Sequence, residues 1–369
     1  MAAPSSSLLK KQENQELDWL EWLRGWSRLL SEGLFQKIKA KHLPRKYPLP
    51  QLSGLSCMVT GATSGIGLEI GRQLAESGAH VVMAVRNPKA AHQIIEKWND
   101  RQPNSRLLNV DVMEINLLSL ESVVKFAESW NSSMKPLHVL INNAGIFSMG
   151  EPQKFSRDGY ETHLQVNHLA PALLSVLLLP SLQRGAPSRI VNVNSLMNVV
   201  GFVDPNDMNF FSGKRKFTSL RAYSGSKLAQ VMFTSILARN IPQGIDVLCV
   251  EPGSVRTNVA RDLSKVVQIA YQCMPSFLFD AQQGSRSALF AAIDPDIPKF
   301  CGKLKAEKLA VCAYFSYSCR PIKPAKAAYN EKTSDLVWEK TLDMVGLPSD
   351  AVEKLLEGKE IHCRYGSSL

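Results

Sequence analysis

The stretch TGATSGIG, at residues 60–67, follows a short apolar run and is followed at once by a segment of helical periodicity. Gly61, Gly65 and Gly67 permit a tight turn, a close approach of the backbone to a pyrophosphate, and close packing of a helix on a strand. The first turn of that helix would present N–H groups to the phosphates. Because chance should produce this pattern only about 0.003 times in a chain of this composition, it predicts a dinucleotide-binding strand–loop–helix unit.

Apolar runs rich in valine, leucine and isoleucine alternate with longer helical patterns from Leu55 onward. This alternation predicts a parallel sheet that is covered by helices on both faces and joined by right-handed crossovers. We therefore expect an α/β fold with a single Rossmann-type, doubly wound parallel sheet of about seven strands. Strands are predicted at residues 55–60, 80–85, 106–110, 137–142, 189–193 and 245–250, and helices at 65–77, 89–101, 118–130, 160–182 and 222–240.

The length of the chain, 369 residues, exceeds that of most single domains. A single α/β domain built on one large sheet can nevertheless contain about 250 to 300 residues. With 45% hydrophobic and 21% charged residues, the composition is that of a globular protein. We expect an N-terminal extension and linker at 1–50, a nucleotide-binding domain at 51–346 and a C-terminal tail at 347–369.

The N-terminal extension has a character of its own. Between residues 17 and 38, apolar side chains that include three tryptophans recur at helical spacing, and a basic run follows at 37–46. Such an amphipathic helix is typical of an anchor at a membrane surface, so residues 17–46 are a candidate membrane contact. A helix that packs on the domain or on a partner subunit would give the same pattern, and both interpretations stay open.

The seven cysteines are scattered, odd in number and never spaced as CxxC. This arrangement favours a reducing compartment and argues against a disulfide framework and against a metal site. The longest apolar run, at residues 173–180, is too short to cross a bilayer, so no transmembrane span is expected. We expect an intracellular protein that is cytoplasmic or peripherally attached to a membrane.

The formal net charge of +10 favours anionic partners, namely nucleic acid, a membrane surface or a phosphorylated cofactor. No recognisable nucleic-acid-binding module accompanies the charge, so nucleic acid is not expected as a partner.

The end of the second apolar run indicates which dinucleotide is bound. That run ends VVMAVRN, so Arg86 lies about twenty residues beyond the glycines, and no acidic side chain is there to accept hydrogen bonds from a ribose 2′-OH. A guanidinium suits a 2′-phosphate by its charge and by its planar fork of donors. We therefore expect NADP(H) as the cofactor; the alternative is an arginine that only caps a surface pocket.

Several motifs occur in the order found in the short-chain dehydrogenases/reductases. After TGATSGIG come INNAG at residues 141–145, a serine after the fifth strand, and YSGSK at residues 223–227. The sequence resembles this family from residue 52 to residue 346, and in finer detail it resembles the subgroup that includes the retinol dehydrogenases and the WW-domain oxidoreductase. The resemblance implies a Rossmann-type fold and an oxidoreductase that interconverts a carbonyl and an alcohol.

The resemblance also implies a set of catalytic residues. Asn167 would hold a water in a proton relay, and Ser195 would bind and polarise the substrate oxygen. Tyr223 and Lys227 would form the acid/base pair. The cofactor-binding residues implied in this way, with the glycines and the arginine already described, are Gly61, Ser64, Gly65, Ile66, Gly67, Arg86, Asn116, Asn143, Ala144, Gly145, Tyr223, Lys227, Pro252, Gly253, Val255 and Thr257.

The chemistry of carbonyl reduction explains a tyrosine–lysine pair. A ketone that accepts a hydride develops negative charge on its oxygen, which needs a nearby donor and a source of protons. A free tyrosine, with a pKa near about 10, is a weak acid, but a lysine ammonium held close favours the phenolate. A spacing of four residues places Tyr223 and Lys227 on nearly the same face of a helix. Chance alone would supply about 0.5 such pairs in this chain, so the pair depends on the other motifs for support.

Two positions depart from the family pattern. Asn116 stands where relatives carry an aspartate that binds the adenine amino group; its amide oxygen could still accept that bond, without charge. Glu251 precedes Pro252 where a neutral or imidazole side chain is commoner, which would alter the local pocket.

The substrate is expected to be a small lipophilic carbonyl or alcohol. In this family the segment after Pro252 covers the substrate site, and residues 259–279 are rich in apolar side chains here. The alternative is that these side chains only pack the covering segment on the core.

We therefore expect an NADP(H)-dependent oxidoreductase, with a homodimer as a further expectation. The competing hypothesis is an NADP-binding regulatory or scaffold protein at a membrane surface, with little turnover. The presence of Asn167, Ser195, Tyr223 and Lys227 favours the enzyme.

Overall fold

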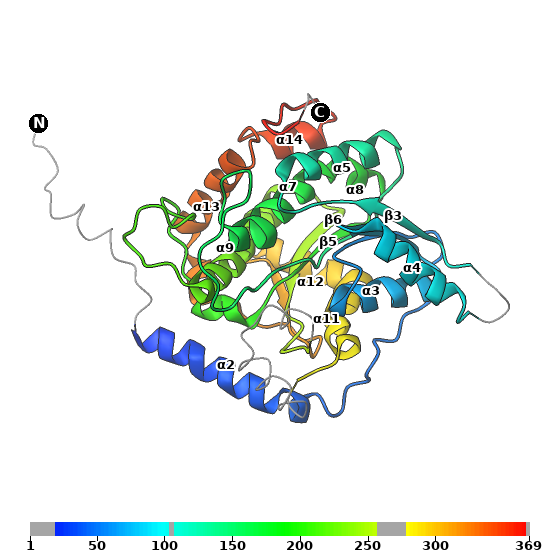
Figure 1. The fold of residues 1–369 in the computed structure, drawn as a ribbon, viewed down its shortest axis with the longest axis horizontal. Coiled ribbons are helices and arrows are strands. Elements are labelled where there is room, and N and C mark those ends of the chain that lie inside the picture. The colour runs from blue at the N-terminus through cyan, green and yellow to red at the C-terminus, as the bar shows by residue number, and fades with distance from the viewer. Residues whose placement is uncertain (1–18, 103–106, 257–277, 367–369) are drawn as a thin grey trace, which may run out of the picture.

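A seven-stranded, all-parallel sheet forms the centre of the molecule (Figure 1). The computed structural model describes residues 19–102, 107–256 and 278–366, with side chains from residue 23. The strand order is β3-β2-β1-β4-β5-β6-β7, which confirms the expected doubly wound α/β fold. The strands are β1 (Ser56–Thr60), β2 (His80–Val85), β3 (Val110–Glu114), β4 (Val139–Asn142), β5 (Ser188–Val193), β6 (Ile245–Val250) and β7 (Ala313–Phe315).

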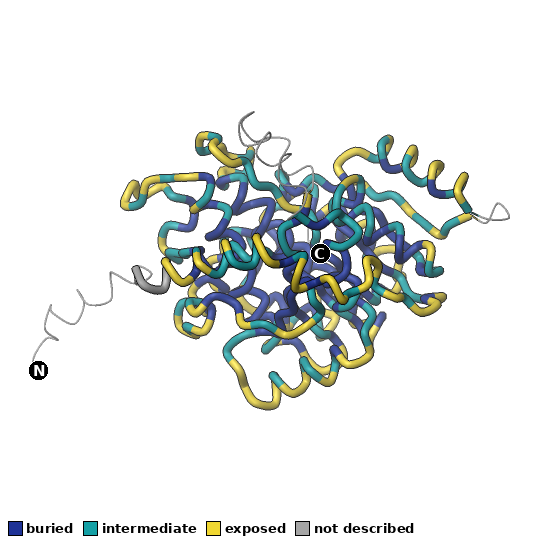
Figure 2. The backbone as a smooth tube through the Cα atoms, turned by 90° about the horizontal axis from the view of Figure 1, so that it is seen from below, coloured by how far each residue is buried: buried dark blue, intermediate teal, exposed yellow. Residues whose placement is uncertain are grey.

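Helices cover both faces of this sheet. The helices α3, α4, α11 and α12 share an apolar cluster with Cys57 and Val59 on one face, and α5, α7 and α9 share one with Met58 and Leu140 on the other. Outside that second layer, α13 packs on α9, and α14 packs on α7 and α8 (Figure 1). In Figure 2 the buried residues, in dark blue, are concentrated in the interior of the molecule. Neighbouring residues of β1 thus point to opposite cores, and both cores are apolar. The helices are α2 (Trp19–Lys39), α3 (Gly65–Glu76), α4 (Pro88–Asn99), α5 (Leu120–Ser132), α6 (Thr162–Leu164), α7 (Ala170–Leu177), α8 (Leu179–Arg184), α9 (Ser219–Asn240), α11 (Ala281–Ile293), α12 (Ile297–Ala306), α13 (Glu331–Met344) and α14 (Ala351–Leu356).

The third strand lies elsewhere than predicted. The sequence pattern placed it at residues 106–110, whereas β3 spans Val110–Glu114, and Leu107 outside the strand is 75% exposed. Because β3 is an edge strand, none of its side chains is fully buried, and it carries charged residues that the apolar pattern passes over. The seventh strand has only three residues, too few to form a recognisable pattern.

The helix predicted at residues 160–182 is also wrong as one continuous element. The chain there forms the short α6, a π-helical turn at Gln165–Leu169, then α7 and α8. The break between α7 and α8 falls at Leu178, two residues before Pro180, whose ring cannot donate a helical hydrogen bond. The π-helical turn contains the candidate catalytic Asn167, and such turns are frequent at functional sites.

Helix α2 packs on the domain. This agrees with one of the two interpretations of its sequence pattern, that of a helix packed on the domain or on a partner subunit. A Cβ atom on Gly25 would lie 2.9 Å from a methyl group of Val200, so the helix backbone approaches the segment after β5 closely. Further along, Glu32 accepts a 2.8 Å hydrogen bond from the Tyr317 hydroxyl.

The C-terminal residues contribute to the core on the α9 side of the sheet. Leu347, Val352, Ile361 and Cys363 are buried in the same apolar cluster as α9 and α13. The boundaries at residues 50 and 346 stay predictions. Within residues 19–102, 107–256 and 278–366, no helix has the length and apolar character that a bilayer crossing requires.

Candidate active site

A cleft of about 370 Å³ lies at the carboxyl ends of β1, β2 and β4. This is the point where the strand order reverses direction, at which doubly wound sheets bind dinucleotides. Nine of the predicted cofactor residues line it: Gly61, Ser64, Gly65, Ile66, Arg86, Asn116, Asn143, Ala144 and Gly145. The structure thus brings together residues that are more than eighty positions apart in the chain.

A cluster of hydrogen bonds forms the floor of this cleft. The Thr60 hydroxyl accepts hydrogen bonds of 3.0 Å from the backbone N–H groups of Asn143 and of Ala144. The Asn143 side chain donates a 2.9 Å hydrogen bond back to the Thr60 carbonyl. Gly61, at φ +68°, keeps the backbones this close, since a Cβ atom there would lie 3.0 Å from the Ala144 Cβ. The ends of β1 and β4 are therefore fixed to each other.

The outer end of the cleft is cationic. Arg86 is exposed at the end of β2, next to Asn87, whose side chain caps α4 through the Ala90 N–H at 3.2 Å. Among the described residues that line the cleft, none is acidic. The Asn116 side-chain oxygen accepts a 3.1 Å hydrogen bond from the Leu118 N–H, so it also orders its own turn. An arginine at one end and no acidic side chain in the described lining suit a dinucleotide that carries a 2′-phosphate.

Lys227 lies buried beside the inner end of the cleft. Its ammonium donates a 2.9 Å hydrogen bond to the carbonyl of Val193, the last residue of β5. A Cβ atom on Gly145 would lie 3.6 Å from Lys227 Nζ, so a larger residue would separate the lysine from the cleft. Burial lowers the pKa of Lys227 to about 8, because desolvation disfavours the charged ammonium.

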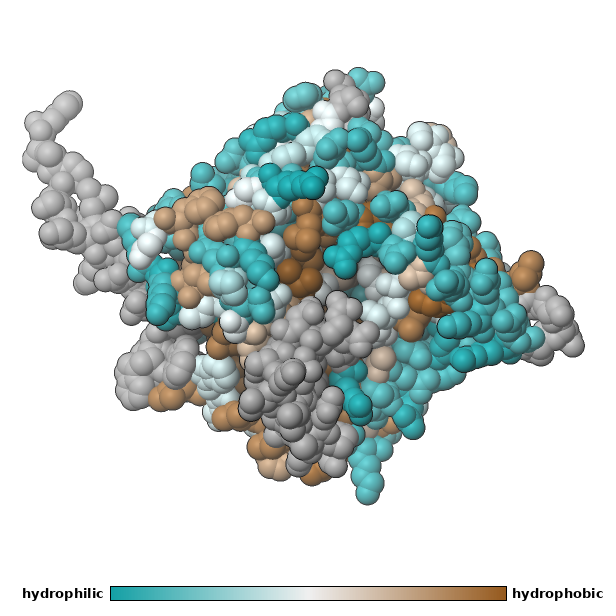
Figure 3. All heavy atoms as spheres, viewed as in Figure 1, coloured by the Kyte–Doolittle hydropathy of each residue, from teal (hydrophilic) through white to brown (hydrophobic). Residues whose placement is uncertain are grey.

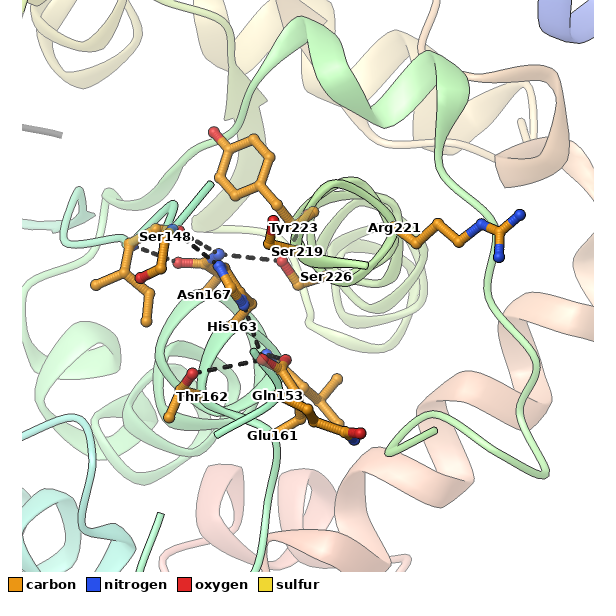
Figure 4. A network of polar contacts seen from close by, with 12 residues as sticks. Ser148, Gln153, Glu161, Thr162, His163, Asn167, Ser219, Arg221, Tyr223 and Ser226 are labelled. Atoms are coloured by element: carbon orange, nitrogen blue, oxygen red, sulfur yellow. Dashed lines mark hydrogen bonds and ion pairs between the residues drawn. The ribbon is translucent and has the colours of Figure 1, made fainter. Parts of the chain in front are cut away.

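Asn167 connects the cleft to α9. Its side-chain oxygen accepts a 2.8 Å hydrogen bond from the Ile146 N–H, and its amide nitrogen donates to the Ile146 carbonyl at 3.0 Å and to the Ser226 hydroxyl at 3.1 Å. Figure 4 shows Asn167 between the loop after β4 and the end of α9 that carries Tyr223 and Ser226. The amide is fully buried, so its orientation is fixed.

Ser195 is held against α9 by its neighbour Asn194. The Asn194 side chain donates 2.8 Å and 2.9 Å hydrogen bonds to the Lys227 carbonyl and the Gln230 side chain, and it accepts one from the Ser195 N–H. The Ser195 hydroxyl accepts a 3.2 Å hydrogen bond from the Met197 N–H at the start of a 3₁₀ turn, Leu196–Val200.

Tyr223 is positioned by two rings. Phe147, two residues beyond the NNAG motif, stacks on it at 4.4 Å between centroids, and His163 meets it edge-on at 6.5 Å. The Ser148 N–H donates to His163 Nε2 at 3.0 Å, so Nδ1 carries the proton that is shared with Glu161 at 2.7 Å. This buried histidine is thereby fixed in one tautomer (Figure 4).

The family resemblance implies that a loop with Pro252, Gly253, Val255 and Thr257 contacts the nicotinamide and phosphate of the cofactor. Its described residues, 252–256, which we call the PG loop, lie next to the glycine loop. Gly253 has φ +78°, and Val255 and Ile66 share a small apolar cluster with Phe279. Thr257 and most of the apolar segment at 259–279 lie outside the described residues. Before the loop, Glu251 is buried, and burial raises the pKa of its carboxyl to about 7.

The sequence matches the short chain dehydrogenase family over residues 56–205 and 208–268, more than half of the chain. The chain belongs to this family. The catalytic roles of Asn167, Ser195, Tyr223 and Lys227 stay predictions.

Named relatives extend this family assignment to nearly the whole chain. The sequence is 58% identical to the Arabidopsis thaliana dehydrogenase/reductase SDR family member FEY, over 99% of this chain and 98% of that protein. It is 33% identical to human retinol dehydrogenase 12, over 80% of this chain and 88% of that protein. The resemblance to the retinol dehydrogenase subgroup is therefore confirmed.

Solved structures of other proteins share the fold. An uncharacterised Mycobacterium Paratuberculosis protein is 28% identical, with a TM-score of 0.61 over 80% of this chain and 95% of that chain. A Beutenbergia cavernae protein described as an NAD(P) dependent gluconate 5-dehydrogenase, with bound NADP, is 25% identical, with a TM-score of 0.53 over 67% of this chain and 92% of that chain.

Several residues that contact the predicted catalytic residues were not predicted from the sequence. Phe147, His163 and Asn194 act through contacts with residues far away in the chain, and Glu161 acts through its hydrogen bond to His163. The position of Asn194, directly before Ser195 at the end of a strand, is the only signal among them.

The buried Lys227 predicts a pH dependence of stability. Its pKa is about 8 in the folded protein and 10.5 by its ordinary value, so between these pH values the unfolded chain holds a proton that the folded protein has released. The free energy of unfolding should therefore rise with pH across this window by roughly 3 kcal/mol relative to Lys227→Met, which cannot titrate there. Chemical denaturation of the parent and of Lys227→Met, both without cofactor, from pH 7 to pH 10.5 would measure this difference in the free energy of unfolding. If the free energies of the two proteins changed with pH in parallel, the lowered pKa of Lys227 would be contradicted.

Proposed function

We propose that this short-chain dehydrogenase is an NADP(H)-dependent oxidoreductase that interconverts a carbonyl and an alcohol. One observation carries the proposal: buried Lys227 lies one helical turn from Tyr223, is hydrogen-bonded through Asn194 to the backbone of Ser195, and borders the dinucleotide cleft at Gly145. These contacts support one site in which Tyr223 and Lys227 form the acid/base pair and Ser195 binds the substrate oxygen beside the cofactor.

The residues of this site would divide the work between them. NADPH, when bound, supplies the hydride. Tyr223 would give its proton to the substrate oxygen, and the positive charge of Lys227 would favour the resulting phenolate. The Ser195 hydroxyl would bind the same oxygen and stabilise its developing charge. Asn167, locked by Ile146 and Ser226, would hold the relay through which Tyr223 regains a proton.

Arg86 supports NADP(H) over NAD(H), since it is the cation at the end of β2 and no described cleft residue is acidic. The Beutenbergia cavernae structure with bound NADP has the same fold.

The Arg86→Gln variant should lose affinity for NADPH by about tenfold or more, because the 2′-phosphate loses a charged, bidentate partner. Its affinity for NADH should stay within about twofold, since NADH lacks that phosphate. Titration of both cofactors would measure the difference. Arg101→Gln, which removes a charge beyond the far end of α4, is the matched control and should leave both affinities unchanged; equal losses for NADH and NADPH in Arg86→Gln would contradict the assignment.

Tyr223→Phe should abolish NADPH-dependent reduction of carbonyl compounds, with at least about a hundredfold loss, because phenylalanine has no proton to give. The ring remains to stack on Phe147, so folding and NADPH binding should survive. A panel of lipophilic aldehydes and ketones, followed by NADPH absorbance, provides the measurement. Tyr329→Phe, at an exposed tyrosine, is the control; undiminished turnover in Tyr223→Phe would refute the mechanism.

The substrate class that we propose is lipophilic. The aromatic pair Phe147 and Tyr223 lies beside the predicted reaction site, and the segment at 259–279 is apolar in sequence. The similarity to a protein named retinol dehydrogenase 12 points in the same direction.

The outward face of α2 supports a membrane surface as a partner. Leu23, Leu30, Leu34, Phe35 and Ile38 are between 44% and 70% exposed, although α2 packs on the domain with its other face. Hydrophobic atoms accordingly gather along the lower edge of the molecule in Figure 3, where α2 lies in the same view of Figure 1. The basic side chains at the end of this helix and just beyond it are Lys37, Lys39, Lys41, Arg45 and Lys46. An apolar helix face beside lysines fits a bilayer with anionic lipids.

The combined variant Leu30→Ser, Phe35→Ser and Ile38→Ser should bind vesicles of phosphatidylserine and phosphatidylcholine at least about tenfold more weakly than the parent, because it loses the buried apolar area. Co-sedimentation at low and high salt would measure the affinity and its charge dependence.

A control for this measurement replaces exposed apolar residues elsewhere, with Leu107→Ser, Met134→Ser and Leu336→Ser. The control should bind as the parent does. Equal binding by both triple variants would show that α2 does not mediate the contact.

The homodimer and the reducing compartment stay predictions. A regulatory or scaffold protein that binds NADP with little turnover is the alternative function, and tight NADPH binding without reduction of any carbonyl in the panel would favour it.

A further inference from the structure

One buried glutamine on α2 binds both polar backbone groups of a single PG-loop residue. Gln36 Nε2 donates a 2.8 Å hydrogen bond to the Ser254 carbonyl, and Gln36 Oε1 accepts a 2.8 Å hydrogen bond from the Ser254 N–H. The Gln36 side chain is almost fully buried, with 1% exposure, and lies 218 positions before Ser254. The amide therefore pairs with Ser254 as a neighbouring strand would.

Phe279 holds the same loop from a second side. The Phe279 N–H donates to the Ser254 carbonyl at 2.9 Å, and the Arg256 N–H donates to the Phe279 carbonyl at 2.8 Å. A Cβ atom on Gly253 would lie 2.8 Å from the Phe279 ring and 2.9 Å from Gln36 Oε1. The loop is thus confined between α2 and Phe279, in a conformation that has φ +78° at Gly253.

This confinement reaches the glycine loop through apolar contacts. Ala40 at the end of α2, Val255 of the PG loop and Phe279 form one cluster, against which Ile66 of α3 packs. A buried amide in such a place costs free energy unless both of its polar atoms are paired, so Gln36 stabilises only the loop conformation that pairs with it. Glu32 of α2 reaches the same cluster, because its partner Tyr317 packs edge-on against Phe279 with 5.2 Å between the ring centroids, but this contact does not pair with the backbone of the loop.

We propose that Gln36 is a positioning residue for the cofactor: through it, α2 holds the PG loop in the conformation that binds the nicotinamide end of NADP(H). The inference rests on the proposed function, because it takes the PG loop as a cofactor contact. The N-terminal helix is accordingly part of the cofactor site, although it lies outside the segment that the family match covers.

The contact itself is tested without cofactor. In Gln36→Leu, a side chain of similar size that cannot pair, the Ser254 amide should exchange with deuterium at least about tenfold faster than in the parent, because its acceptor is gone. Gln73→Leu is the matched control: Gln73 is a buried glutamine between α3 and α11 whose amide nitrogen donates to Ser285 at 2.9 Å and to Glu69 at 3.4 Å, and not to Ser254. It should leave exchange at Ser254 unchanged, and unchanged exchange in Gln36→Leu would overturn the proposal.

The role in cofactor binding is tested by affinity and by kinetics. Gln36→Leu should bind NADPH about tenfold more weakly and raise its KM by a similar factor, while kcat at saturating NADPH stays within about twofold. Gln73→Leu should keep the parent's affinity even where it lowers thermal stability. Faster exchange at Ser254 with unaltered NADPH affinity would overturn the positioning role. Absence of NADPH binding by the parent protein would instead refute the proposed function.

A conservative variant separates positioning from a merely structural role. In Gln36→Glu a protonated carboxyl can donate to and accept from Ser254 as the amide does, whereas a carboxylate can only accept. At pH 5.5, where we expect the buried carboxyl to be protonated, the variant should bind NADP⁺ within about twofold of the parent's affinity. At pH 8, where we expect a carboxylate, it should bind NADP⁺ at least about fivefold more weakly than the parent does. Other ionisable groups near the loop and α2, including Glu32, Glu251, Asp280 and Tyr317, are present in both proteins. A ratio that does not change with pH would overturn the proposal.

Discussion

The hydroxyl of Thr60 fixes the geometry on which the rest of the site depends. By accepting hydrogen bonds from Asn143 and Ala144 it joins the ends of β1 and β4, and the chain continues through Gly145 and Ile146 to the Asn167 side chain. Asn167 in turn binds Ser226 on α9. A continuous set of short contacts thus runs from the dinucleotide cleft to the helix that carries Tyr223 and Lys227. Since each link is buried or partly buried, a shift at the cleft would be transmitted to the catalytic helix rather than absorbed by solvent.

The burial of Lys227 is the costly part of this arrangement. A charged ammonium inside the protein is unfavourable unless it is hydrogen-bonded, and Val193 supplies one acceptor. The neighbouring turn of α9 contains residues with little intrinsic preference for helix, and the structure gives a packing reason for one of them: a Cβ atom on Gly225 would lie 2.8 Å from the Phe202 carbonyl. Close backbone packing on one side of α9 therefore accompanies a buried charge on another.

Local patterns were sufficient for much of the fold and for the centre of the site. TGATSGIG and NNAG come together at the floor of the cleft, where the close approach of the two backbones requires glycines and small side chains. The pattern failed at β3, an edge strand without a buried face, and at residues 160–182, where a π-helical turn and Pro180 interrupt the helical period. The residues that contact Tyr223, Ser195 and Ser254 could not be predicted from the sequence. A pairing such as that of Gln36 with Ser254 produces no pattern in the sequence around either residue.

Helix α2 has two faces with different contacts: one holds the PG loop through Gln36, and the other exposes apolar side chains such as Leu30 and Ile38. Two ligands that act on one rigid element are linked thermodynamically, and the linkage is reciprocal. If a ligand on the outer face alters the free energy of ordering α2, it changes the affinity of the nucleotide for its site by some factor. The nucleotide then changes the affinity of the outer ligand by the same factor. A single helix would then couple occupancy of the nucleotide site to occupancy of its own outer face.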